Sequence, residues 1–178
     1  MQAQDFSKMM EAEIPRLRRY ARALTRDEVN ADDLVQDCLF RGLSKQHLWV
    51  GGTDLRAWLF TILHNQYVNS VRRSVRQGSQ VAISDAVSSL TRAANQHHRL
   101  ELRDLNRALA LLPEQQRSVI LLVGLEGMAY EAVAEILGVP VGTIRSRLSR
   151  GRAELRKLMG MVPDHRADAR MARSLKAA

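Results

Sequence analysis

The sequence predicts an all-α protein that contains two small helical domains joined by a flexible linker. Apolar residues recur at helical spacing in residues 1–76 and again in residues 97–160. The segment between them, 77–96, is small, polar and poorly periodic, which is typical of an interdomain linker. No segment shows the alternation of a strand or an internal repeat, and a basic tail, 161–178, follows the second domain.

Three amphipathic helices are expected in the first domain. The first covers Ile14 to Leu24, with arginines between its apolar positions. Asn30 is a good N-cap for the second helix, and the Gly51-Gly52 pair interrupts the pattern before a third helix begins. The second helix has an inward stripe made of Ala31, Leu34, Val35, Cys38 and Leu39. The third has one made of Leu55, Trp58, Leu59, Ile62 and Leu63.

The second domain is predicted to end in two short helices joined by a tight turn. Helical periodicity runs from Leu102 to Leu112, pauses at Pro113 and resumes ahead of the pair. Gly138 can take the left-handed conformation that ends the first helix, and Pro140 fits the first turn of the next. The inward face of the first helix is expected to contain Ala129, Ala132, Val133, Ile136 and Leu137.

The second helix of this pair has the side chains of a DNA-reading helix. Val141, Ile144 and Leu148 are expected to face inward. The outward residues, which can bind base edges or phosphates in a major groove, are Thr143, Arg145, Ser146, Arg147 and Arg150. A plain helical hairpin with a solvated basic face is the alternative. DNA binding is favoured because Glu154 is the only acid among six cations: Arg145, Arg147, Arg150, Arg152, Arg156 and Lys157.

Charge and composition restrict the class of protein. Lys and Arg number 27 against 19 Asp and Glu, so the net charge is +8 and a polyanionic partner is expected. No apolar run is long enough to span a bilayer, and the first residues lack the pattern of a secretion signal. Cys38 is the sole cysteine, which fits a reducing cytoplasm and a buried, inert thiol. The five histidines show no metal-ligand spacing, so no metal site is expected. No cofactor is expected either.

Four segments, taken in order, resemble the second and fourth conserved regions of bacterial sigma factors. The first two are Ala-Asp-Asp-Leu-Val-Gln-Asp at 31–37 and Trp-Leu-Phe-Thr-Ile-Leu-His-Asn at 58–65. The others are Leu-Pro-Glu-Gln-Gln-Arg at 112–117 and Pro-Val-Gly-Thr-Ile-Arg-Ser-Arg-Leu at 140–148. With only these two regions and a short join, the chain is similar to the extracytoplasmic function (ECF, group IV) sigma factors from about Ile14 to Lys157.

The resemblance gives the acidic face of the second helix a partner. Asp33, Gln36 and Asp37 point away from the apolar stripe and form an acidic patch on a basic protein. The resemblance implies that these residues dock on the coiled coil of the largest subunit of core RNA polymerase. The alternative is a solvated helix face whose N-terminal acids favour the helix dipole.

The resemblance also assigns residues to the two promoter elements. The loop that would capture a flipped base of the minus-ten element contains Trp49, Val50, Gly51, Gly52, Thr53 and Asp54. Contacts to the non-template strand are expected from Asn65, Asn69, Arg72 and Arg73. Trp58 fits the core better than a stacking platform, and Trp49 is open to either role. The minus-thirty-five element, which is duplex DNA, would be read by the second helix of the helix-turn-helix, through its outward residues between Thr143 and Arg150.

The function implied is that of a transcription initiation factor with no covalent chemistry of its own, held inactive by an anti-sigma factor. An operator-binding regulator with a dimerising or sensing first domain is the alternative, but it leaves the acidic patch, the paired glycines and the basic helix unexplained. A nuclease or recombinase using Asp32, Asp33 and Asp37 as metal ligands is the third possibility. It lacks a further acidic motif to complete a two-metal site.

Overall fold

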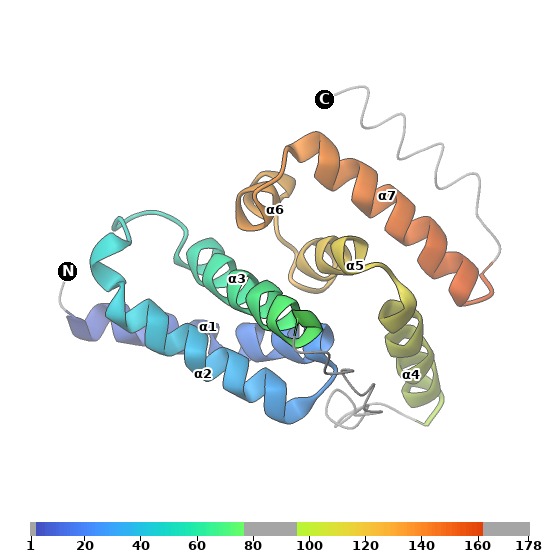
Figure 1. The fold of residues 1–178 in the computed structure, drawn as a ribbon, viewed down its shortest axis with the longest axis horizontal. Coiled ribbons are helices and arrows are strands. Elements are labelled where there is room, and N and C mark those ends of the chain that lie inside the picture. The colour runs from blue at the N-terminus through green and yellow to red at the C-terminus, as the bar shows by residue number, and fades with distance from the viewer. Residues whose placement is uncertain (1–2, 77–95, 162–178) are drawn as a thin grey trace.

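The computed structural model describes residues 3–76 and 96–161, and every regular element in these two ranges is a helix (Figure 1). The first half contains α1 (Ala3–Thr25), α2 (Glu28–Ser44), the 3₁₀ turn η1 (Gln46–Leu48) and α3 (Leu55–Arg76). The second contains α4 (Gln96–Leu111), α5 (Glu114–Ile120), the π-helical turn η2 (Leu121–Leu125), α6 (Tyr130–Leu137) and α7 (Val141–Leu158). The all-α prediction is therefore confirmed. Residues 77–95 of the predicted linker and 162–178 of the predicted tail lie outside the described residues.

The three long helices of the first half pack side by side around an apolar core. α1 begins at Ala3, well before the predicted start at Ile14. The reason is that Phe6 and Met10 continue its apolar stripe by a further two turns, and both are buried. The predicted stripe of α2 is confirmed, because its residues are buried or half-buried and Cys38 has no exposed surface.

Asp27, and not Asn30, caps the N-terminus of α2, so this part of the prediction was wrong. The backbone of Asp27 is extended, and its Oδ1 accepts a hydrogen bond from the backbone nitrogen of Asn30 at 2.7 Å. Starting at Asp27 also places Glu28 in the first turn, where its negative charge favours the helix dipole. The turn from α1 into α2 puts Arg26 at a φ of 59°, in the left-handed region that a non-glycine residue rarely adopts.

The helix-turn-helix is formed by α6 and α7, with two corrections to its predicted details. Gly138 takes the predicted left-handed conformation, with φ 63° and ψ 38°. Ala129, predicted to be buried, is exposed at the N-cap position because its backbone is extended and α6 begins one residue later. Ala134 is buried in its place. Pro140 is the N-cap of α7 and lies just outside its first turn.

The two halves of the chain dock against each other, which the sequence did not predict. α3 lies against α6 (Figure 1). In addition, α1 contacts η2. Buried side chains from both halves form one contiguous hydrophobic cluster that joins Phe60 and Leu63 to Leu122 and Val133. Within the described ranges, no helix has the length and apolar character needed to cross a bilayer. The same residues contain no group of three or more His, Cys, Asp or Glu side chains placed to hold a metal ion.

Candidate nucleic-acid interface

The α7 helix presents a polar, cationic face that is anchored by apolar contacts behind it. Ile144 and Leu148 are buried as predicted, and Val141 packs at the edge of the core. Gly151 lets α7 approach α5 closely, since a Cβ placed there would lie 2.8 Å from Cδ1 of Ile120. This packing fixes the direction in which the opposite face of α7 points.

The predicted DNA-reading residues of α7 fall into two environments. Arg145, Ser146 and Arg150 are exposed, and Arg150 Nε donates a hydrogen bond to the backbone oxygen of Ser146 at 3.3 Å. Thr143 and Arg147 are half-buried. Arg147 lines a cleft toward α3, away from the open surface of the helix. The exposed trio can reach a major groove without rearrangement, whereas Arg147 first has to leave the cleft.

The acidic face of α2 is open to a partner. Asp33, Gln36 and Asp37 are all exposed. Asp32 differs from its neighbour, because it faces α1 and lies 3.5 Å from Nε of Arg18. The carboxylates of the run 31–37 therefore do not converge on one point as metal ligands would.

Apolar side chains flank this acidic face, and the sequence reading missed them. Val29 and Phe40 are 70% and 72% exposed. They lie four residues before Asp33 and three residues after Asp37, so they share the acidic face of the helix. The available signal was the interruption of the polar face by a valine and a phenylalanine at helical spacing.

The loop between η1 and α3 is short and internally bonded. Thr53 Oγ1 donates a hydrogen bond to the backbone oxygen of Val50 at 2.7 Å, and Gly52 has a φ of 90°. Asp54 Oδ1 accepts a hydrogen bond from the backbone nitrogen of Ala57, so this carboxylate bonds the first turn of α3. Residues 50–54 are exposed. They can meet a ligand as a preformed turn.

The two tryptophans belong to the packing of the first half. Trp49, the first residue of the predicted loop, is 9% exposed, and its ring centroid lies 5.5 Å from that of Phe6. Trp58 is half-buried and makes an edge contact with Phe6 at 6.2 Å. In this arrangement the Trp49 ring is covered, so base stacking on it would require the loop to move.

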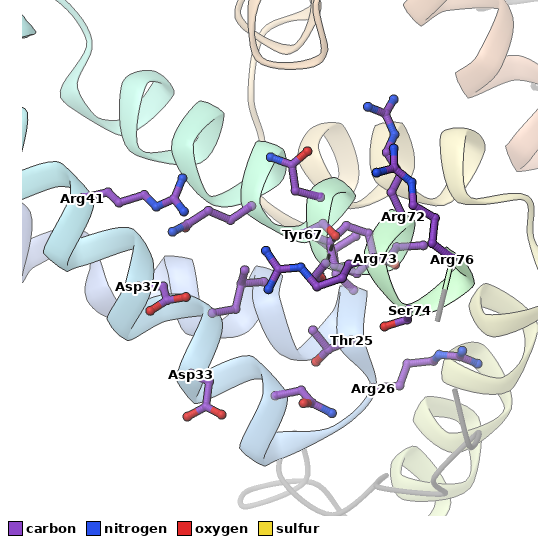
Figure 2. Close-up of a pocket in the computed structure, with 17 residues that line it drawn as sticks. Thr25, Arg26, Asp33, Asp37, Arg41, Tyr67, Arg72, Arg73, Ser74 and Arg76 are labelled. Carbon is purple, nitrogen blue, oxygen red and sulfur yellow. Dashed lines mark hydrogen bonds between the residues drawn. The ribbon is translucent and has the colours of Figure 1, made fainter. Parts of the chain in front are cut away.

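A cleft of about 640 Å³ separates α2 from the C-terminal half of α3 (Figure 2). The predicted polymerase-docking carboxylates Asp33 and Asp37 line its α2 side, and the predicted strand-binding residues Asn69, Arg72 and Arg73 line its α3 side. Figure 2 shows Arg41 and Arg73 pointing into the space between the helices. The structure thus brings two sets of residues together that the sequence assigned to different partners.

Further residues of this cleft were missed by the sequence reading. Arg26, Arg41 and Arg76 add positive charge to its walls, and Gln66 also lines it. Gln66 is 7% exposed, and neither amide atom has a hydrogen-bond partner among the described residues. Burial and the nearby Arg117 guanidinium lower the pKa of Arg26. The only available signal was the spacing of Gln66 and Arg73 on one side of α3.

A buried polar network lies beside these surfaces, where α1, α3 and α5 meet. The Tyr20 hydroxyl lies 3.2 Å from Nδ1 of His64, and Arg117 donates a hydrogen bond from Nη2 to the Tyr67 hydroxyl at 3.0 Å. Burial lowers the pKa of His64 to about 4, so the ring is neutral near pH 7. Burial also raises the pKa of the Tyr20 hydroxyl. Both groups serve as neutral hydrogen-bonding partners in the core.

Two family models match the two halves of the chain. Residues 10–64 match the sigma2 domain of PhyR, and residues 102–155 match sigma-70, region 4. These ranges contain α2 and the start of α3 in one case, and the helix-turn-helix in the other. The predicted order of the two regions is therefore confirmed.

Relatives that match most of the chain are named RNA polymerase sigma factors. The ECF RNA polymerase sigma factor EcfG of Rhodopseudomonas palustris is 39% identical over 148 residues, which cover 83% of this chain and 81% of that protein. The RNA polymerase sigma factor YlaC of Bacillus subtilis is 30% identical, over 72% of this chain and 77% of that protein.

Two solved structures also match most of the chain. The sigma factor RpoE of Bartonella quintana, solved in complex with the anti-sigma factor NepR, matches with a TM-score of 0.76 and 35% identity, over 90% of this chain and 99% of that one. CnrH, solved in complex with the cytosolic domain of CnrY, matches with a TM-score of 0.68 and 25% identity, over 89% of this chain and 90% of that one. The chain belongs to the ECF RNA polymerase sigma factor family.

Proposed function

We propose that the chain binds core RNA polymerase, directs it to a small set of promoters and helps to open the DNA strands at the minus-ten element. One observation carries the proposal. A single molecule exposes both an acidic helix face, at Asp33, Gln36 and Asp37, and the cationic face of a helix-turn-helix, at Arg145 and Arg150. An operator-binding regulator needs only the second of these surfaces.

The acidic face of α2 is the proposed docking site for the polymerase coiled coil. Its exposed carboxylates would pair with cations of the partner, and the exposed rings and methyl groups of Phe40 and Val29 would add apolar contact around them. A mixed patch of this kind suits a protein partner better than a nucleic acid, because the carboxylates repel phosphates.

Residues 50–54 and the exposed polar side of α3 form the proposed minus-ten reader. The preformed turn at Gly51 and Gly52 offers backbone groups to an unstacked base, while Asn65, Asn69, Arg72 and Arg73 offer amides and guanidinium groups to the strand. Asp54 positions this turn by bonding the start of α3. Trp49 supports the turn from the core.

The minus-thirty-five element is assigned to α7. Arg145, Ser146 and Arg150 would enter the major groove, with Thr143 and Arg147 joining once the helix is seated. The proposed units are 1–76 for polymerase and minus-ten binding, 77–96 as connector, 97–160 for minus-thirty-five binding and 161–178 as a tail.

Membership of group IV and control by an anti-sigma factor are part of the proposal. They are supported by the two-region organisation and by the complex with the anti-sigma factor NepR in which RpoE was solved. Such a factor acts where polymerase and chromosome are, in the cytoplasm.

Strand opening is the step that distinguishes this function from plain DNA binding. Core polymerase and the chain are incubated on promoter fragments, and unpaired thymines are detected by permanganate. We expect reactive thymines in the minus-ten region only when both proteins are present. Protection of DNA by the chain alone, with no polymerase association and no reactive thymines, would favour the operator-binding regulator.

A further inference from the structure

The carboxylate of Glu126 is buried between the two halves of the chain. Glu126 lies in the turn between η2 and α6, and its side chain has no exposed surface. Arg19 of α1 donates two hydrogen bonds to it, from Nε to Oε1 at 2.8 Å and from Nη2 to Oε2 at 2.9 Å. This paired geometry is the strong, bidentate form of an arginine–carboxylate contact.

Arg56 of α3 completes the contact from a second helix. Its Nη2 lies 3.2 Å from Oε2 of Glu126 and also donates a hydrogen bond to the Glu126 backbone oxygen. One carboxylate of the second half therefore holds two helices of the first. Hydrogen bonding to Glu126 raises the pKa of Arg19, which favours the charged form of its guanidinium.

The docked arrangement places residues proposed for different promoter elements in one small space. Asn65, Asn69 and Arg72 of α3 line a cleft of about 370 Å³ together with Arg147 of α7. That volume is typical of a small-molecule pocket. The cleft is too small to admit a DNA duplex against α7 or a separated strand along α3. While the cleft stays closed, Arg147 cannot join the exposed residues of α7 in a major groove, and the side of α3 that faces α7 is closed to a separated strand.

We propose that Glu126 is an intramolecular latch, which holds the two halves in a closed state that has to open before Arg147 and the covered side of α3 can reach the promoter. The inference rests on the proposed function and adds a regulatory step to it. Opening removes two guanidinium groups from a buried carboxylate and breaks the Arg117–Tyr67 hydrogen bond, which also joins the two halves. A partner that binds only the open form, such as polymerase on its promoter, shifts the equilibrium by its difference in affinity.

The first test measures the distance between the halves in the full chain. Spin labels are placed at exposed positions of α1 and α7 through Glu11→Cys and Ala153→Cys, while Cys38 stays buried. We expect a single short, narrow distance distribution in the otherwise unchanged chain. Glu126→Gln keeps the shape but removes the charge, and should raise the open-to-closed ratio at least about tenfold, or about 1.4 kcal/mol.

Two further variants keep the test decisive. Arg19→Gln removes the bidentate partner from a half-exposed position and should open the chain in the same direction, even if Glu126→Gln unfolds. Glu135→Gln removes an equal charge from an exposed site of α6 and should leave the distribution unchanged. The latch is overturned if folded Glu126→Gln and Arg19→Gln variants keep the closed distribution, or if Glu135→Gln opens the chain equally.

A titration of transcription separates the latch from the proposed function. Run-off transcription with core polymerase on genomic promoter fragments is measured against the concentration of each variant. A latch predicts that Glu126→Gln reaches half-maximal transcription at a severalfold lower concentration. An opened distribution with an unchanged titration overturns the regulatory role. Absence of transcription with every variant, the unmutated chain included, contradicts the proposed function, while the distance measurement still tests the latch.

Discussion

Neighbouring aspartates of α2 should behave differently when each is changed to asparagine. Asp33 is exposed and has no ion pair within the described ranges, whereas Asp32 is half-buried and lies 3.5 Å from Nε of Arg18 and 4.0 Å from Nη2 of Arg22. Asp33→Asn should therefore leave the free energy of unfolding within about 0.5 kcal/mol of its original value, as for most surface changes. Asp32→Asn should lower it by up to about 1 kcal/mol, since half-exposed ion pairs contribute little.

For polymerase binding, the Asp33 change should have the larger effect of the two. If Asp33 meets a cation of the polymerase coiled coil in a desolvated contact, Asp33→Asn should weaken binding by at least about tenfold. Asp32 faces α1, so Asp32→Asn should change the affinity for polymerase by no more than about twofold. Urea unfolding gives the stabilities, and fluorescence anisotropy of labelled chain with core polymerase gives the affinities. A chain in which Asp32→Asn weakens binding and Asp33→Asn does not would refute the placement of the docking face.

Three other changes probe the DNA face and the buried network. Arg145→Ala should lower affinity for the preferred minus-thirty-five duplex by about 1–3 kcal/mol and relax its sequence preference, measured by gel shift; an equal loss on all duplexes would mean a phosphate contact. Tyr67→Phe removes the acceptor for the buried Arg117 and should cost about 1.5–3 kcal/mol in urea unfolding, whereas Tyr130→Phe, with no hydroxyl contact within the described residues, should cost about 0.5 or less. Burial lowers the pKa of His64 to about 4, so between about pH 6.5 and pH 4 the unfolded chain binds a proton at this ring that the folded chain does not. The contribution of neutral His64 to the free energy of unfolding should therefore be complete above about pH 6.5 and fall by about 2–3 kcal/mol on acidification toward pH 4. His64→Gln should flatten that decline, and an unchanged pH profile would contradict the assignment.

Residues whose roles depend on local spacing were predictable from the sequence. The buried stripe of α2, the exposure of Asp33, Gln36 and Asp37, and the buried Ile144 and Leu148 follow from helical periodicity. The left-handed Gly138 follows from the conformational freedom of glycine at a helix end. The errors fall at helix ends. Two residues suited to capping lie three positions apart at Asp27 and Asn30, and the choice between them depends on the turn that leaves α1.

The contact between the halves could not be predicted in the same way. Glu126 is 107 residues from Arg19 and 70 from Arg56, and a single glutamate after an apolar run carries no signal of burial. The cleft between α2 and α3 could not be predicted either, because tertiary packing is what brings Arg41 and Arg73 to the same space. The polymerase-docking and DNA-contact roles stay predictions, since each depends on a partner that the chain does not contain.

Run-off transcription with purified chain and core RNA polymerase tests the central claim most directly. Genomic fragments serve as templates, and the Asp33→Asn and Arg145→Ala variants serve as controls for the two surfaces. We predict discrete transcripts that require the chain and decrease strongly with either variant. A chain that neither joins the polymerase nor yields a transcript on any fragment would contradict the account.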